Sequence, residues 1–369
     1  MINRWSDVRP LSPVDDLVHQ SRLVGAEESL VLWGGGNNSI KTTAEDLLGN
    51  TIEVMLIKSS GSDMKSIAAK QFPAVRLDYI RPLRHRAEMS DEEMADYLTR
   101  CLTDPSGPRP SIETLLHAFL PAVAVLHTHA DAILALTNTK GGQATVRRCF
   151  GDSVIRIPYR RPGFLLSREV AEGLERAPDS AGLILMNHGL ITWGASAREA
   201  YERHIDLVSR AEEFAARGES VSSAKTAKRS DADRVGPVLR GALSDRRSLV
   251  LELDDSEAVM QFVSRPDLDR VSQHGAATPD HLLHTKRFPV IVKDVDAVRA
   301  AVDAYIEKYA AIYATRKSAF PMLDPTPRVI LVPGIGMFTA GKDARAARIV
   351  RDIYRHTIEI ITTAERLGG

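Results

Sequence analysis

The chain has 369 residues, 44% of them apolar, so it can bury a large core in one or two domains, and its 48 basic and 48 acidic side chains balance. That balance excludes a strong net electrostatic attraction to nucleic acid or anionic membranes, so any anionic ligand must be bound by a local group of residues. No stretch approaches the roughly 20 apolar residues that span a bilayer, and no secretory signal is evident. Cys101 and Cys149 lack the spacing of a disulfide scaffold. We therefore expect a globular cytoplasmic protein without a membrane or nucleic-acid partner.

Residues 1–217 alternate between strand-like and helix-like segments. Apolar and β-branched runs between polar turns predict strands at 28–36, 39–43, 51–61, 74–83, 121–129, 153–159 and 181–187. Helices are predicted at 90–102, 110–120, 130–138 and 196–218. The first of these helices begins with a capping box made by Ser90 and Glu93.

A second domain is predicted after a linker. Residues 218–231 are small, polar and charged, which is typical of a linker, so we expect domains at 1–217 and 232–369. The second domain contains a helix-rich stretch and then a strand, helix, strand, helix order, typical of a small α/β layer, at 287–292, 295–314, 327–334 and 344–366.

The segment GMFTAGKD in the second domain is close to a phosphate-binding P-loop. Its last residue, Asp343, stands where that motif needs a serine or threonine hydroxyl for Mg²⁺. We therefore interpret the segment as a glycine-rich turn between a strand and a helix, with Asp343 as a cap.

Two histidines stand one residue apart at the end of the predicted strand 121–129. In a strand, side chains at i and i+2 point to the same face, so His127 and His129 can reach one point. His188 follows another apolar strand and precedes a glycine, where a turn would present it at a sheet edge. Taken alone, the pair can also be two satisfied polar residues, but three neutral imidazoles make a zinc site with a position open for substrate.

Glu113 is predicted in the first turn of the helix at 110–120, which leads into the histidine-bearing strand. An acid there can simply complement the helix dipole. Beside a metal, it also suits a general base that removes a proton α to a carbonyl. The remaining histidines singled out are interpreted as loop, packing, cap or surface residues: His85, His117, His204, His281 and His284.

Five motifs occur in one order, namely GGGNNS at 34–39, KSSG at 58–61, PSIE at 110–113, HTH at 127–129 and NHG at 187–189. Together they resemble the class II aldolase/adducin family of zinc-dependent sugar-phosphate aldolases. The resemblance implies a three-layer αβα domain with a central mixed or antiparallel sheet, followed by a smaller C-terminal α/β unit. Further segments resemble the aldolase half of bacterial proteins that join a rhamnulose-1-phosphate aldolase to a short-chain dehydrogenase. Since no dehydrogenase follows, we expect no NAD.

The resemblance also implies roles for single residues. It gives His127, His129 and His188 as ligands of Zn²⁺ or another divalent transition metal, and Glu113 as the catalytic acid/base. Small aldolases often carry a second serine where this chain has Ile112, so phosphate is expected to be bound differently, or the substrate lacks phosphate. The implied phosphate or substrate contacts are Asn37, Lys58, Ser60, Gly61 and Ser111.

The implied reaction is cleavage of a ketose, in particular a deoxyketose 1-phosphate such as rhamnulose or fuculose phosphate. The products are a dihydroxyacetone-type fragment and an aldehyde, formed through a zinc-stabilised enediolate. Two alternatives stay open: a sugar-phosphate 4-epimerase or decarboxylase with the same metal site, and a non-catalytic, adducin-like interaction protein. Family members commonly form tetramers, so a homo-oligomer is expected.

Overall fold

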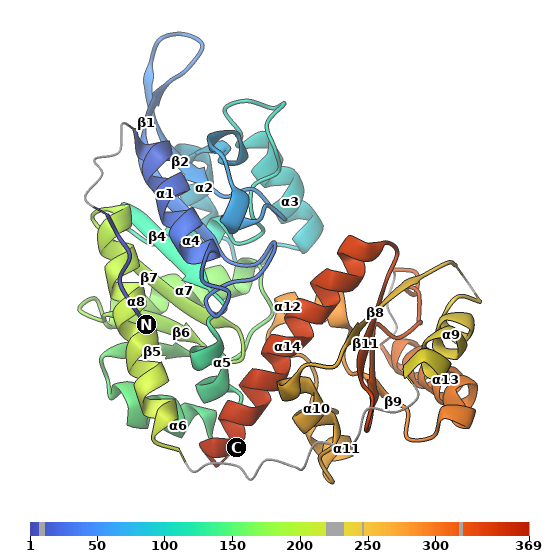
Figure 1. Ribbon diagram of the computed structural model, residues 1–369. Coiled ribbons are helices and arrows are strands. Elements are labelled where there is room, and N and C mark those ends of the chain that lie inside the picture. The colour runs from blue at the N-terminus through green and yellow to red at the C-terminus, as the bar shows by residue number, and fades with distance from the viewer. Residues whose placement is uncertain (7–11, 219–231, 246, 317–319, 369) are drawn as a thin grey trace. The chain divides into compact units, whose positions relative to one another are not determined.

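The computed structural model describes residues 1–6, 12–218, 232–245, 247–316 and 320–368. The chain divides into two compact units, residues 1–219 with 363–369 and residues 220–362, and each is described by itself (Figure 1). Apart from Gly218, the predicted linker at 218–231 lies outside the described residues. No described helix has the length and apolar character needed to cross a membrane.

The first unit is built on a seven-stranded mixed sheet with the strand order β3-β2-β1-β4-β7-β6-β5. Neighbouring strands are antiparallel except β5 and β6, which run parallel. The strands are β1 (Asn37–Glu45), β2 (Thr51–Ile57), β3 (Ala74–Arg76), β4 (Ala124–Thr128), β5 (Val154–Ile157), β6 (Gly182–Leu185) and β7 (Gly189–Gly194).

Helices cover both faces of this sheet, as the predicted three-layer αβα fold requires. Side chains alternate along β4, so Leu126 packs among residues of α1 and α8, while Val125 packs among residues of α4 and α7. The helices are α1 (Pro13–Gly25), α2 (Leu77–Ile80), α3 (Asp91–Arg100), α4 (Thr114–Phe119), α5 (Asp131–Thr137), α6 (Gly142–Phe150), α7 (Phe164–Arg176) and α8 (Ala197–Ala216), with short 3₁₀ turns η1 (Met64–Ser66), η2 (Ala69–Gln71) and η3 (Arg81–His85).

The second unit is the smaller α/β unit that was expected. Its four-stranded sheet has the order β8-β11-β10-β9, in which only β9 and β10 run parallel. The strands are β8 (Val250–Asp254), β9 (Val290–Ile291), β10 (Val329–Val332) and β11 (Gly336–Gly341). The helices are α9 (Ala232–Leu243), α10 (Glu257–Val263), α11 (Leu268–Val271), α12 (Pro279–Thr285), the 3₁₀ turn η4 (Val295–Ala297), α13 (Val298–Thr315) and α14 (Ala344–Arg366), which continues beyond residue 362.

The P-loop-like segment is a strand and a helix cap. Gly336–Gly341 forms β11, so the predicted glycine-rich turn is wrong for these residues. Asp343 does act as a cap, because its Oδ1 accepts a hydrogen bond of 2.8 Å from the backbone N–H of Ala346.

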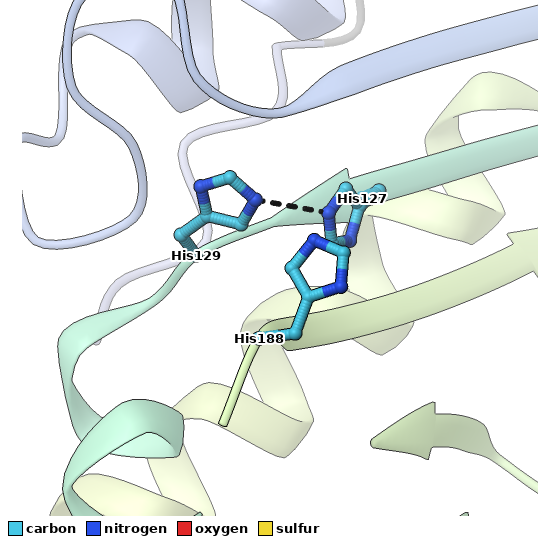
Figure 2. A group of neighbouring side chains, drawn as sticks. All are labelled: His127, His129 and His188. Atoms are coloured by element: carbon cyan, nitrogen blue, oxygen red, sulfur yellow. Dashed lines mark hydrogen bonds between the residues drawn. The ribbon is translucent and has the colours of Figure 1, made fainter. Parts of the chain in front are cut away.

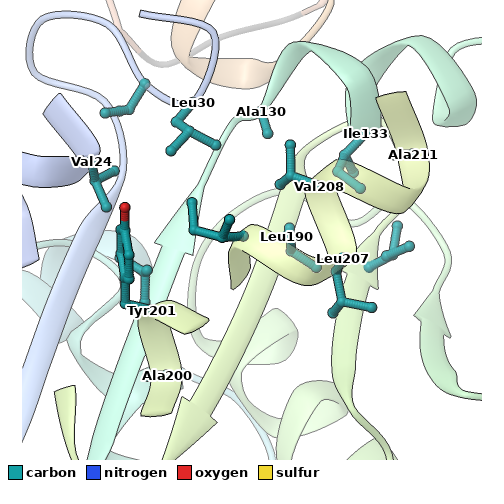
Figure 3. Packing of buried hydrophobic residues seen from close by; sticks show 14 of the residues in the cluster. Val24, Leu30, Ala130, Ile133, Leu190, Ala200, Tyr201, Leu207, Val208 and Ala211 are labelled. Atoms are coloured by element: carbon teal, nitrogen blue, oxygen red, sulfur yellow. The ribbon is translucent and has the colours of Figure 1, made fainter. Parts of the chain in front are cut away.

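Two predicted strands are wrong for physical reasons. Residues 28–36 form turns, because Trp33 and Gly36 have left-handed backbone angles (φ 49° and 61°) that interrupt an extended chain, while Leu30 is buried in the core (Figure 3). In the segment 74–83 only β3 is extended; α2 and η3 follow, and Pro82 cannot donate to a strand ladder. By contrast, the capping box of Ser90 and Glu93 on α3 is confirmed.

Candidate metal centre

Three histidines meet at the ends of two adjacent central strands. His127 belongs to β4 and His129 directly follows it, while His188 lies in the turn between β6 and β7. Because β4 and β7 are antiparallel, with Thr128 opposite Leu190, the end of one strand lies beside the start of the other. The three rings converge in Figure 2, and one potential ligand atom from each lies within 4.8 Å of the others.

The protonation of His127 fits a metal ligand. Its Nδ1 lies 2.9 Å from the backbone carbonyl oxygen of Leu190, which can only accept, so Nδ1 carries the proton and Nε2 presents a lone pair. A backbone carbonyl that fixes the tautomer of a ligating histidine in this way is a recurring feature of metal sites.

The spacing of the nitrogens fits a transition metal. Nε2 of His127 lies 3.1 Å from Nε2 of His129, and two ring nitrogens this close repel each other unless a proton or a cation lies between them. Tetrahedral zinc, with Zn–N bonds of about 2.0–2.1 Å, separates its nitrogen ligands by about 3.3 Å. The three-histidine cluster is therefore a candidate site for a divalent metal ion.

Glu113 lies against this cluster as an ionised carboxylate. Its Oε1 is 3.4 Å from Nε2 of His188, and its Oε2 is 3.6 Å from Nε2 of His127. Burial raises the pKa of Glu113, but positive charge at the neighbouring histidines, which a bound cation would supply when the rings are neutral ligands, and a hydrogen bond from Asn37 lower it to about 2. Oε1 is buried and accepts no hydrogen bond from any described residue. One oxygen of the carboxylate therefore keeps its basic lone pairs for another partner.

The local backbone places Glu113 one residue earlier than predicted. Glu113 is the N-cap residue of α4 and not part of its first turn, because a turn closed by the bond from Thr114 N–H to the Ser111 carbonyl precedes the helix. The Asn37 amide nitrogen donates to Oε2 of Glu113 at 2.6 Å and to the Ser111 hydroxyl at 3.2 Å. The structure thus brings Asn37 and Ser111 to the carboxylate.

The remaining predicted substrate contacts lie on a neighbouring pair of loops. The N–H of Ser60 donates to the carbonyl of Arg109 at 3.0 Å, and the N–H of Ser111 donates to the carbonyl of Lys58 at 3.2 Å. Ser60 and Gly61 are exposed, but Lys58 is only 2% exposed and its Nζ donates to the carbonyl of Gly34 at 3.0 Å. The KSSG and PSIE motifs therefore lie side by side, with Lys58 directed at the glycine-rich loop.

The NHG turn has a steric reason for its glycine. A Cβ at Gly189 would lie 2.2 Å from the carbonyl oxygen of Thr128 and 2.9 Å from Cε1 of His127. Asn187 has a left-handed backbone (φ 56°), and its side chain donates to the Thr137 carbonyl and to Asn138. Gly189 therefore allows the histidines of two strands to approach each other.

Sequence reasoning missed two contributors, the carbonyl of Leu190 and the side chain of His117. His117 was interpreted as a packing or cap residue, yet it is fully buried and bonded to Asn37. Its position four residues after Glu113, on the same face of the helix, is the signal that could have identified it.

Two family models match the chain: the N-terminal domain of class II aldolase and adducin over residues 15–214, and the second domain of class II aldolase over residues 230–369. The uncharacterized oxidoreductase YuxG of Bacillus subtilis is 38% identical over 96% of this chain and 55% of its own length, so this chain spans about half of that relative.

Two further proteins are similar to part of this chain. A methylthioribulose-1-phosphate dehydratase of Pseudomonas paraeruginosa is 32% identical over 34% of this chain and 74% of its own length. The solved N-terminal class II aldolase domain of a conserved protein from Thermoplasma acidophilum is 44% identical, with a TM-score of 0.55 over 58% of this chain and 99% of that one.

Metal content should depend on the three histidines. We expect the protein, after incubation with Zn²⁺ and gel filtration, to hold one ion per chain by mass spectrometry. His127→Ala should weaken binding by more than the roughly 10–100-fold that loss of a supporting hydrogen bond costs, because it removes a ligand. The control is His85→Ala, since His85 is exposed in η3. Equal metal content in the two variants would contradict the site.

Gly189→Ala should disrupt the centre without removing a ligand. Its Cβ would collide with the Thr128 carbonyl, 2.2 Å away, so the paired strands must separate. We expect a stability loss of about 1–3 kcal/mol in urea unfolding and a lower Zn²⁺ affinity. Gly141→Ala is the matched control, because a Cβ there meets nothing within 4 Å. Wild-type Zn²⁺ affinity in Gly189→Ala would show that the strands tolerate the methyl group.

Proposed function

The chain belongs to the class II aldolase and adducin family, and on that basis we propose that it is a metal-dependent lyase that cleaves a ketose phosphate by a retro-aldol reaction. The observation that carries the proposal is the ionised Glu113 carboxylate, 3.4–3.6 Å from Nε2 of two histidines of the candidate metal site. Chemistry at a carbon next to a carbonyl needs a base and an electrophile close together, and this arrangement supplies both.

Each residue of the site has a part in the proposed mechanism. A divalent cation held by His127, His129 and His188 would polarise the carbonyl of the substrate as a Lewis acid. In the condensation direction, Oε1 of Glu113 removes a proton from the carbon next to the carbonyl of the dihydroxyacetone-type fragment. In the cleavage direction, the β-hydroxyl loses its proton to water as the carbon–carbon bond breaks and the aldehyde forms, and Glu113 then returns a proton to the carbon of the dihydroxyacetone-type fragment. Asn37 holds the other carboxylate oxygen and keeps Oε1 directed at the reacting carbon.

We propose that the substrate phosphate contacts the paired loops 58–61 and 109–111. Ser60 and Gly61 are exposed there, and the hydroxyl of Ser111 lies next to Asn37. Lys58 acts on the phosphate by its charge and by holding the carbonyl of Gly34, which keeps the glycine-rich loop in place. The proposal includes a homo-oligomer, for which family membership is the support.

A second candidate reaction is the dehydration of a ketose phosphate. It is favoured by the 32% identity to a methylthioribulose-1-phosphate dehydratase over 152 residues. Dehydration and the condensation direction of the aldol reaction both begin when a base removes a proton next to a carbonyl. The two reactions then differ in the bond that breaks: dehydration expels the β-hydroxyl as water, whereas the retro-aldol reaction breaks a carbon–carbon bond.

A product screen tests the proposed function. Ketose 1-phosphates and free ketoses are incubated with the metal-loaded and the chelated protein, and the products are followed by NMR. We expect an aldehyde and a dihydroxyacetone-type fragment, formed only with metal. A dicarbonyl of unchanged carbon number indicates a dehydratase, a C4 epimer an epimerase, and CO₂ from a sugar acid a decarboxylase. No metal-dependent product from any substrate would overturn the enzyme proposal in favour of an interaction protein.

Glu113→Gln should separate proton transfer from metal binding. The amide keeps the size of the carboxylate but cannot take a proton, so we expect kcat to fall by roughly 10²–10⁴-fold with metal content unchanged. Glu92→Gln is the control, because Glu92 is exposed in the first turn of α3. Turnover of Glu113→Gln at the rate of the control would show that Glu113 is not the base.

A further inference from the structure

His117 is held at both ring nitrogens within the core behind the candidate site. Its Nδ1 lies 2.8 Å from the hydroxyl of Ser39, and its Nε2 lies 2.5 Å from Oδ1 of Asn37. The side chain is completely buried, and this burial lowers the pKa of His117 to about 3. The imidazole is therefore neutral, with one donor and one acceptor nitrogen.

The hydrogen bonds around His117 can run in only one direction. The amide nitrogen of Asn37 faces Glu113 and donates to its Oε2 at 2.6 Å, and it also donates to the hydroxyl of Ser111 at 3.2 Å. The amide oxygen of Asn37 then faces His117, whose Nε2 must donate. The hydroxyl of Ser39 in turn donates to Nδ1. A directed chain thus runs from Ser39 through His117 and Asn37 to Glu113.

The side-chain amide of Asn37 can change its orientation while the backbone of Asn37 stays fixed. Asn37 pairs with His127 in the sheet, so its backbone is fixed beside the metal-site strand. Asn37 and Ser39 are two residues apart on β1 and share a face, which allows them to bond the two nitrogens of one imidazole. His117 lies one helical turn after Glu113, and its N–H donates to the Glu113 carbonyl at 3.2 Å. Strand β1 therefore supplies Ser39 and Asn37 to the chain of bonds. Helix α4 and its N-cap residue supply the other two members.

Without the donor on His117, the amide oxygen of Asn37 loses its partner, and the orientation of the amide depends on Glu113 and Ser111 alone. A rotation by 180° would place its oxygen against the carboxylate, and two acceptors 2.6 Å apart repel each other. The carboxylate of Glu113 would then move away from Asn37 and lose its fixed distance to His127 and His188.

We propose that His117 is a positioning residue: it sets the orientation of the Asn37 amide and thereby holds the Glu113 carboxylate in place beside the three histidines. The inference rests on the proposed function, because it assigns His117 to the base of that reaction. It adds a residue that acts on the proposed base through the side chain of Asn37.

Two substitutions of similar size test the proposal. In His117→Gln the amide nitrogen can occupy the place of Nε2 and donate to Asn37, whereas in His117→Asn the shorter amide can replace only Nδ1. We expect His117→Gln to keep kcat within about 5-fold of wild type, and His117→Asn to lose roughly 10–100-fold, with KM and metal content unchanged in both. Deuterium incorporation from D₂O into the dihydroxyacetone-type fragment should follow the same order, because it reports proton transfer alone.

A measurement without turnover separates this proposal from the proposed function. In wild-type protein with ¹⁵N-labelled histidine, the resonances of His117, assigned by their absence in His117→Gln, should show a neutral ring protonated at Nε2. A ring protonated at Nδ1, or an imidazolium, would overturn the proposal whether or not the protein turns over a substrate. Equal kcat in the two variants would also overturn it. Failure of the proposed function has a different signature, which is a wild-type protein that converts no ketose phosphate.

Discussion

The antiparallel pairing of β4 with β7 is the constraint on which the candidate centre depends. It places the end of β4, with His127 and His129, beside the turn that carries His188. The same pairing brings the carbonyl of Leu190 to Nδ1 of His127 and so decides which nitrogen faces the other rings. Gly189 makes the close approach possible, because any side chain there would collide with β4. The strand pairing that builds the sheet therefore also builds the candidate metal site.

A layer of buried polar side chains supports the centre from behind. His204 on α8 bonds to the hydroxyls of Thr128 and Thr192, which lie on β4 and β7, and burial lowers the pKa of His204 to about 3, so the ring is neutral. His117 does the equivalent on the side of β1 and α4. Buried polar groups cost free energy unless they are bonded, and a fully bonded network specifies one geometry. These histidines fit that logic, since each uses both ring nitrogens.

Family membership and the three-histidine cluster define the fold and the candidate metal site. Which of the proposed reactions occurs there depends on the groups around Glu113. In the proposed reactions, dehydration begins with a proton removed next to a carbonyl, whereas retro-aldol cleavage ends with a proton returned there. They differ in which bond of the substrate is aligned to break. For the ketose phosphates proposed as substrates, this alignment depends on where the phosphate is held. Ile112, half exposed between Ser111 and Glu113, is an apolar side chain beside the base, so the proposed polar contacts to phosphate are assigned to the paired loops 58–61 and 109–111.

The sequence by itself determined the features that depend on local spacing. The i, i+2 histidines, the capping box at Ser90, and the long helices at α8 and α14 follow from periodicity and cap residues, and the structure has them where they were predicted. Spacing, periodicity and caps are set by residues close together along the chain. The mixed sheet with helices on both faces was expected from the family resemblance of the ordered motifs, and the structure agrees with it.

Only the tertiary structure decided the features that depend on distant segments. Residues 28–36 have a strand-like composition but fold as turns, Lys58 is buried against the glycine-rich loop, and His117 is bonded to two residues of β1. The strand β7 and the helices α1, α6 and α7 were not predicted, and the N-cap position of Glu113 follows from a turn that sequence did not reveal. In each case the outcome depends on which buried partner meets a side chain or backbone group, and that partner lies on another segment of the fold.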